Sequence, residues 1–239
     1  MTRMIATLLA LSLSAPLFAD DWPQWGGPQR DLVWREKGIV KTLPPGLLPR
    51  VWTTPIGEGY SGPAVADGKV FITDLVDRKN KGATERALCL DAAGGKVLWT
   101  YAYPVEYGIS YPAGPRATPV VDADRVYIAG AVGDLACLDV ATGKVLWKRS
   151  LTEDYGANLP TWGLSASPLI DGNQLITLVG GKGAALVVSF DKMTGKELWK
   201  AIDCPEVGYV PPVIFTFGGL RQLIQWHPRA VTSLDPDLI

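Results

Sequence analysis

The sequence predicts an all-β fold, a β-propeller of four-stranded antiparallel blades, and three observations support this prediction. A motif recurs at a nearly fixed period, and short apolar runs separated by turn residues surround each copy. No segment beyond residue 19 shows an apolar stripe with helical spacing. Together these observations favour a series of small sheets and exclude stacked pairs of helices.

The repeated motif is Asp-x-x-Thr-Gly-Lys-x-x-Trp. It occurs at 139–147 and 191–199, occurs with glycine in place of threonine at 91–99, and begins a fourth time at 233–236. Successive tryptophans at the ends of such units are 47, 48 and 52 residues apart, namely Trp52, Trp99, Trp147 and Trp199. A period of about 40 to 50 residues with four strands per unit is typical of propeller blades.

The turn inside the motif has a physical basis. Gly143 and Gly195 can adopt the positive φ that a type I turn with a G1 bulge requires. Asp139 and Asp191, like Asp91 in the first unit, can accept hydrogen bonds from amides within the turn. We expect the closing tryptophans to pack between neighbouring sheets, where they bury a large flat ring.

The expected organisation has three parts. Residues 1–19 resemble a signal peptide, because Arg3 precedes a mostly apolar run and Ala19 completes a cleavage site. We therefore expect export to the periplasm or the cell exterior, with retention as an uncleaved anchor as the alternative, and no membrane span after signal removal. An N-terminal extended segment at 20–49 then leads into the repeats at 50–239.

The repeats predict three complete blades at about 61–106, 114–156 and 162–207, and a partial blade at 210–239. Residues 50–52 resemble an outer strand that completes a blade begun at the other end of a ring. Because propellers typically contain about four to eight blades, we expect an incomplete ring that is a fragment of a larger one.

Composition excludes several functions. The 239 residues carry a formal charge of −1 and no basic cluster, so nucleic acid is not an expected partner. The only histidine, His227, is expected to be a surface or turn residue, and no metal-ligand spacing occurs, so no metal site is predicted. Gly180–Gly183 lacks the spacing of a phosphate-binding loop and is expected to be a β-turn.

Cysteine positions argue against a disulfide. Cys89 and Cys137 hold equivalent repeat positions, which lie about 10 Å apart in stacked sheets and exceed the roughly 7 Å limit for Cα atoms. We expect buried thiols there, and Cys204 can also be free.

At the residues of the motif, the chain resembles the pyrroloquinoline-quinone-like (PQQ-like) β-propeller repeat family, over about 50–239. Three further stretches are similar to its exported, planctomycete-type subgroup: 21–30, 162–168 and 221–228. In that subgroup an arginine usually follows the second tryptophan of the opening stretch, and here Gly26 stands instead.

The resemblance implies two functional classes. Quinoprotein dehydrogenases of this family bind PQQ and calcium and oxidise alcohols or sugars, whereas the outer-membrane assembly lipoprotein uses its propeller as a binding scaffold. The chain has only three asparagines, no vicinal cysteine pair and no calcium-like cluster of acidic residues. We therefore predict a scaffold with no catalytic residues and no cofactor. A PQQ-dependent dehydrogenase completed by residues of further blades, with PQQ and calcium as cofactors, is the alternative.

A binding site is expected on the loops that lead into the innermost strands. Each loop places a large or polar group before its strand, and these candidates are Tyr60, Arg116, Trp162, Ser165 and Tyr209. Arg116 can clamp a carboxylate, and the aromatic rings can stack on a planar ligand. They can equally fill the funnel between blades. The expected partner is an unidentified protein or small molecule at this propeller face.

Four tyrosines crowd the connection between the first two blades: Tyr101, Tyr103, Tyr107 and Tyr111. They can form a partner-binding rim or simply cover blade edges.

Overall fold

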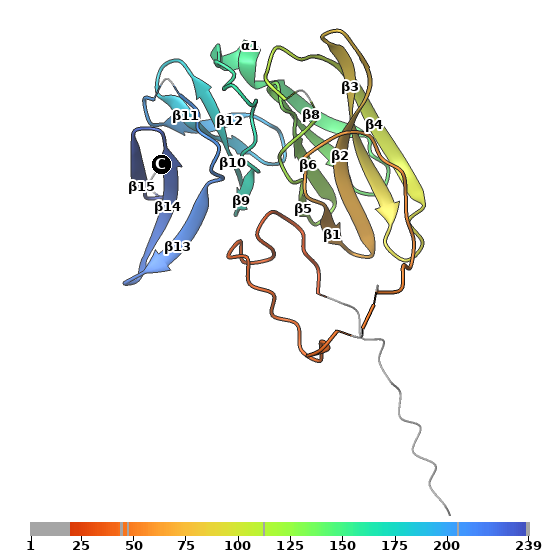
Figure 1. The fold of residues 1–239 in the computed structure, drawn as a ribbon. Helices are drawn as coiled ribbons and strands as arrows, with labels where there is room; N and C mark the ends of the chain where they lie inside the picture. Colours follow the sequence, from red (N-terminus) through yellow and green to blue (C-terminus); the bar gives the residue numbers. More distant parts are fainter. Residues whose placement is uncertain (1–19, 44, 47, 112, 205, 238–239) are drawn as a thin grey trace, which may run out of the picture.

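The computed structural model describes residues 20–237 except 44, 47, 112 and 205 (Figure 1). The expected signal peptide at 1–19 lies outside the described residues. The described chain forms four antiparallel sheets in an open arc, with one short helix, and this confirms the all-β propeller architecture. No helix of the described part has the length and hydropathy that crossing a membrane requires.

Three sheets have four strands and one has three, and we call them blades 1 to 4. Blade 1 contains β1 (Ala64–Ala66), β2 (Lys69–Lys79), β3 (Gly82–Asp91) and β4 (Val97–Glu106). Blade 2 contains β5 (Val120–Asp122), β6 (Arg125–Ala129), β7 (Asp134–Asp139) and β8 (Val145–Ser150). The helix α1 (Leu151–Tyr155) follows, and the periodicity did not predict it.

Blade 3 contains β9 (Leu169–Asp171), β10 (Gln174–Gly181), β11 (Ala185–Asp191) and β12 (Glu197–Ala201). Blade 4 contains β13 (Val213–Phe217), β14 (Leu220–His227) and β15 (Ala230–Leu234). In every blade, consecutive strands pair as antiparallel hairpins in chain order. The turn after Gly181 joins β10 to β11, as expected for a plain β-turn.

The motif turns adopt the predicted geometry. Gly95, Gly143 and Gly195 have φ of 70°, 71° and 70°, and the strand register shifts by a bulge beside each turn. The Asp139 carboxylate accepts a bond of 2.8 Å from the Thr142 amide. Asp191 and Asp91 make the same contact, at 2.8 Å from the Thr194 amide and 2.7 Å from the Gly94 amide. The aspartate thus stabilises the turn that positions the glycine.

The tryptophans join neighbouring blades. The Trp99 indole donates to the Val140 carbonyl of blade 2 at 2.8 Å, and the Trp147 indole donates to the Lys192 carbonyl of blade 3 at 2.9 Å. A Cβ atom added to Gly143 would lie 2.6 Å from the Trp99 ring. The repeated glycine is therefore required both by its backbone conformation and by the ring that covers it.

Trp199 departs from this pattern. Its indole donates to the Gln174 side-chain oxygen of its own blade at 2.5 Å, and the Gln174 amide donates to the Pro236 carbonyl at 3.3 Å. A glutamine side chain thus links blade 3 to the start of the fourth motif copy.

The cores lie between the sheets. Phe71 and Cys89 of blade 1 pack with Ile128 and Leu138 of blade 2. A larger core joins blades 2, 3 and 4. Cys89 and Cys137 are free and buried, as expected, and Cys204 is also free and buried. Burial raises the pKa of the Cys89 thiol to about 11.

The N-terminal segment, residues 20–30, contacts all four blades. Trp22 exchanges two backbone hydrogen bonds with Val65 of β1, at 2.8 and 2.9 Å, and Pro23 accepts one from Val121 of β5 at 2.8 Å. Arg30 is buried and donates to backbone carbonyls just before β9 and β13, namely Ser167 at 2.7 Å, Pro168 at 2.8 Å and Pro212 at 3.0 Å. The segment therefore holds the innermost strands in place.

The expectation that His227 lies on the surface was wrong. His227 ends β14 on the face that packs toward blade 3 and is 7% exposed, whereas its neighbour Trp226 is 61% exposed. Its Nε2 atom lies 3.0 Å from the Thr232 hydroxyl. Strand alternation buries the histidine and exposes the tryptophan.

The interface between blades 1 and 2 contains two acidic groups. Glu85 is buried and accepts hydrogen bonds from the Tyr103 hydroxyl at 2.5 Å, the Tyr107 hydroxyl and the Ala131 amide. Burial, together with the charge of Glu85, raises the pKa of Asp134 to about 6, and the nearby Lys148 lowers it only in part.

We predict that Asp134 makes stability depend on pH. Between about pH 4 and 6 the folded chain binds more protons than the unfolded chain, so the free energy of unfolding decreases as pH rises through this window. Asp134→Asn should remove this decrease and stabilise the chain at pH 7 by on the order of 1 kcal/mol. Urea unfolding at pH 4.5 and pH 7 measures both effects, and an unchanged pH slope would contradict the prediction.

Candidate functional site

The structure brings the five predicted binding residues together around one cavity of about 470 Å³. They are Tyr60, Arg116, Trp162, Ser165 and Tyr209, and Tyr111 completes the lining. Because they are far apart in sequence, the propeller arrangement alone makes them neighbours.

Each blade contributes to the cavity through the loop that leads into its innermost strand. Tyr60 precedes β1, and its amide donates to the Pro115 carbonyl of the next loop at 2.8 Å. Arg116 precedes β5, Trp162 and Ser165 precede β9, and Tyr209 precedes β13. The sequence alignment of these loops, each followed by a proline and a short strand, was the signal that identified them.

The aromatic rings leave large surfaces free. Trp162 and Tyr209 have ring centroids 5.3 Å apart at an interplanar angle of 36°. Ser165 lies beside them, with its hydroxyl 3.4 Å from the Tyr209 carbonyl oxygen. Tyr60, Tyr111 and Trp162 are 57%, 70% and 51% exposed. Exposed rings that face one cavity can stack on a flat apolar group.

Arg116 provides the charge of the cavity. It donates to the Gly114 and Tyr111 carbonyls of its own loop, and its guanidinium lies 5.4 Å from the centroid of the Tyr60 ring. Partial burial lowers the pKa of Arg116. Within the described part of the chain, no carboxylate forms an ion pair with it.

The hydrogen bonds of Arg116 use donors on both terminal nitrogens. The guanidinium carries five N–H donors, so donors remain for the carboxylate that the sequence analysis anticipated. The position of this positive charge is set by the loop of Arg116.

Sequence reasoning missed Tyr111 as part of this site. It belongs to the same loop as Arg116, but the alignment of the incoming loops began at Gly114. The tyrosine cluster in fact divides, because Tyr103 and Tyr107 bond to Glu85 between the blades and Tyr101 stacks on Tyr103. Only Tyr111 turns to the central face, since it lies beyond the end of β4.

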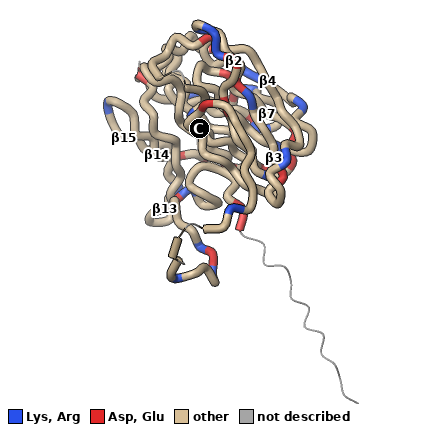
Figure 2. The backbone as a smooth tube through the Cα atoms, turned by 45° about the vertical axis from the view of Figure 1, so that its right-hand side comes forward, with Lys and Arg blue, Asp and Glu red and all other residues tan. Residues whose placement is uncertain are grey.

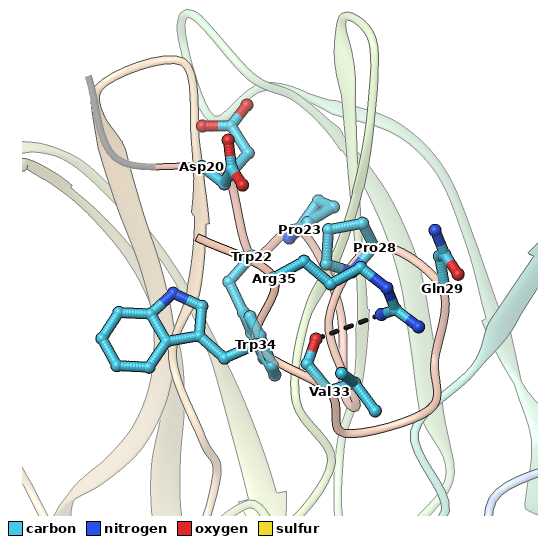
Figure 3. Close-up of a pocket in the computed structure, with 9 residues that line it drawn as sticks. Asp20, Trp22, Pro23, Pro28, Gln29, Val33, Trp34 and Arg35 are labelled. Carbon is cyan, nitrogen blue, oxygen red and sulfur yellow. Dashed lines mark hydrogen bonds between the residues drawn. The ribbon is translucent and has the colours of Figure 1, made fainter. Parts of the chain in front are cut away.

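A second cavity, of about 370 Å³, lies within the N-terminal part of the chain (Figure 3). Its lining comes from residues 20–35 alone and includes Trp22, Trp34 and Arg35, whose guanidinium donates to the Val33 carbonyl at 3.2 Å. It does not combine groups from different blades. We therefore place the candidate site at the central face.

The donor set of the central cavity does not fit calcium with a quinone. Calcium requires about six to eight oxygen ligands, several of them carboxylates, and no acidic residue lines the cavity. The described residues also contain no group of three or more His, Cys, Asp or Glu side chains that could hold a metal ion. Figure 2 shows basic and acidic residues interleaved along the backbone.

Residues 85–208 match the model of a PQQ-like family that is described as outer membrane protein assembly factor BamB. The chain belongs to this family. The match covers the three complete motif copies and the sheets that carry the cavity loops of blades 2 and 3.

Solved structures are similar to this chain, and the one with a TM-score above 0.5 has the same fold. Quinohemoprotein alcohol dehydrogenase from Comamonas testosteroni is 22% identical with a TM-score of 0.53, over 75% of this chain and 26% of that chain. Quinohemoprotein alcohol dehydrogenase ADHIIG from Pseudomonas putida HK5 is 21% identical with a TM-score of 0.45, over 62% and 22%. BamB from Moraxella catarrhalis is 18% identical with a TM-score of 0.35, over 78% and 73%.

This PQQ-like chain spans about a quarter of the length of the two dehydrogenases. No curated protein sequence matches it. At these identities the likeness concerns the fold, and function has to be argued from the site.

Proposed function

We propose that this PQQ-like propeller protein is a non-catalytic binding protein that works outside the cytoplasm. Its central cavity would bind a flat apolar group that carries a negative charge, on a small molecule or on a protein partner. The proposal rests mainly on one observation. Loops of all four blades direct four aromatic side chains and one fixed guanidinium to a single cavity. Such a set supplies binding energy through stacking and charge.

Two kinds of group in the cavity support this proposal, the aromatic rings and the charged guanidinium of Arg116. Trp162 and Tyr209 form an angled surface on which a planar group can stack. Arg116 lies at the rim of the same cavity without an ion-pair partner among the described residues, so an anionic ligand group would complete its interactions. The lack of acidic lining residues favours anions over cations.

We predict that the cavity binds 2-naphthoate, a probe with one flat apolar body and one carboxylate. Trp162→Ala should weaken this binding about tenfold, because one stacking surface is lost. Isothermal titration calorimetry measures the effect. Trp34→Ala is the matched control, since Trp34 is also exposed but lies outside the cavity.

The charge has its own test. Arg116→Met should weaken binding of 2-naphthoate about tenfold or more and leave binding of its uncharged methyl ester unchanged. Equal losses for both probes would show that Arg116 only shapes the loop. Stoichiometric binding of PQQ with calcium, together with alcohol-dependent reduction of a dye, would overturn the non-catalytic proposal.

A further inference from the structure

A third cavity, of about 180 Å³, lies between blades 1 and 2, which stand side by side in the arc (Figure 1). We call it the interblade cavity. Its lining comes from β4 of blade 1 and from three strands of blade 2, namely Tyr101, Tyr103, Pro104, Ile128, 134–136 and 148–149. This lining and that of the central cavity share no residue within the described chain. The interblade cavity is therefore a separate site, formed by two four-stranded sheets.

The strand register explains which side chains of blade 2 face blade 1. Ile128 pairs with Ala136, and Ala136 pairs with Lys148, so the three form one row across the sheet. Asp134 lies two residues before Ala136 and therefore on the same face. Ile128 and Ala136 belong to the core that joins blades 1 and 2, and the two tyrosines of the cavity pack against that core from β4.

The equivalent interface between blades 2 and 3 carries larger apolar side chains. Ala136 corresponds to Val188, because each pairs with the lysine that follows the closing tryptophan of its own blade. Two residues earlier, Asp134 corresponds to Leu186. Val188 and Leu186 are fully buried. An alanine and an aspartate in their places leave room between blades 1 and 2.

The tyrosines on the blade 1 side are held in position from behind. Tyr101 and Tyr103 have ring centroids 5.4 Å apart at an interplanar angle of 29°. The Tyr103 hydroxyl donates to the buried Glu85 carboxylate at 2.5 Å, which fixes the ring between the blades. Glu85 accepts two further hydrogen bonds, from the Tyr107 hydroxyl and the Ala131 amide. This side of the cavity therefore combines two aromatic rings with a buried carboxylate.

Asp134 places a second carboxylate on the blade 2 side. Burial and the charge of Glu85 raise the pKa of Asp134 to about 6, so an added cation would stabilise its ionised form. Lys148 is exposed and forms no ion pair with Asp134 within the described part of the chain. Arg149 donates to Asp154 at 2.7 Å and is thereby already paired. The cavity thus offers a carboxylate without a close cationic partner.

A wider cavity of about 500 Å³ adjoins the first and shares Asp134, Lys148 and Arg149 with it. It also includes the α1 carboxylates Glu153 and Asp154. Three carboxylates thus face two cationic side chains in its lining. A positively charged group can reach the interblade cavity through this acidic region.

We propose that the interblade cavity binds a monovalent organic cation that carries a guanidinium group on a short alkyl stem. The guanidinium would lie against the rings of Tyr101 and Tyr103 and form an ion pair with Asp134. A planar guanidinium suits this arrangement, because it stacks on aromatic rings and donates two hydrogen bonds to one carboxylate. The alkyl stem would contact Ile128 and Ala136. A single charge is expected, because Lys148 adds a positive charge to the same lining.

Titration calorimetry of the chain with butylguanidinium tests the proposal, and pentanamide serves as the uncharged probe. We expect saturable binding of the cation and none of the amide. Asp134→Asn should weaken the binding about tenfold or more, because the ion pair is lost. Glu106→Gln is the matched control, since Glu106 is an exposed carboxylate of β4 outside both cavities. Undiminished binding by Asp134→Asn would overturn the proposal.

Ala136→Val tests the cavity itself, because valine is the residue that blade 3 has at the equivalent position. This variant should lose binding of butylguanidinium while its near-ultraviolet circular dichroism and urea unfolding show an intact fold. Lys148→Gln should strengthen the binding severalfold, because a like charge is removed. Full binding by Ala136→Val, or weaker binding by Lys148→Gln, would contradict a cation in the interblade cavity.

A second probe distinguishes two sources of the guanidinium group. Nα-acetylarginine amide presents the group as a protein side chain does. Equal binding of both probes would assign the cavity to an arginine side chain of a partner, and binding of butylguanidinium alone would assign it to a free small molecule. Binding of neither probe would overturn the proposal.

Discussion

Replacing Arg30 with methionine is expected to lower the free energy of unfolding by about 3–4 kcal/mol. Arg30 is 6% exposed and donates to the Ser167, Pro168 and Pro212 carbonyls. Methionine preserves much of the side-chain volume but leaves these carbonyls without their donor. The loss falls on blades 3 and 4, so their amides should exchange with solvent faster than those of blade 1. Urea unfolding measures the energy, and hydrogen exchange locates it.

Arg35→Met is the matched control for this prediction. Arg35 belongs to the same part of the chain, but its side chain is 44% exposed and pairs with Asp31. An exposed pair contributes only about 0–1 kcal/mol. If the two variants were equally stable, the N-terminal segment would not hold the blades as the structure indicates.

Gly143→Ala is expected to cost about 3–4 kcal/mol, the second large effect. At φ of 71° a Cβ atom is strained, and here it would lie 2.6 Å from the Trp99 ring. The ring has to move, and its hydrogen bond to Val140 is lost with it. Thermal and urea unfolding measure the loss of stability. Quenching of tryptophan emission by acrylamide should increase as the ring becomes accessible.

Gly172→Ala separates backbone strain from ring displacement. Gly172 has φ of 57° in the turn between β9 and β10, and no atom lies within 4 Å of the Cβ position. This variant should cost only about 1–2 kcal/mol. Equal costs at both glycines would mean that the tryptophan contact between blades adds no stability.

The repeat made most of the fold predictable, because each motif residue has a local physical task. The aspartate accepts turn amides, the glycine adopts positive φ, and the tryptophan reaches the next turn. These roles depend on residues close in sequence or on the adjacent blade, so they can be predicted from a single sequence. The same alignment placed the loops of Tyr60, Arg116, Trp162 and Tyr209 on one face, where the structure finds them around one cavity.

Contacts between distant segments could not be predicted. The Arg30 side chain donates hydrogen bonds to backbone carbonyls that lie 137 to 182 residues away in the sequence. No local sequence pattern predicts these hydrogen bonds. The opening stretch lacks the expected arginine at Gly26, yet the guanidinium of Arg30 lies 5.4 Å from the Trp25 ring centroid. The burial of His227 likewise depends on which face of β14 meets blade 3. Such features follow from packing between blades, which the periodicity does not specify.

The central claim is that the aromatic cavity binds a flat anionic group. The most direct measurement is a titration of the ¹⁵N-indole-labelled chain with 2-naphthoate, followed by NMR, with the Trp162 signal assigned from its loss in Trp162→Phe. We predict that the Trp162 signal shifts to saturation while Trp34 and Trp226, which lie outside the cavity, stay unchanged, and that Arg116→Met reduces the shift. Saturable shifts at Trp34 or Trp226 without Trp162, or no shift at any indole, would contradict the claim.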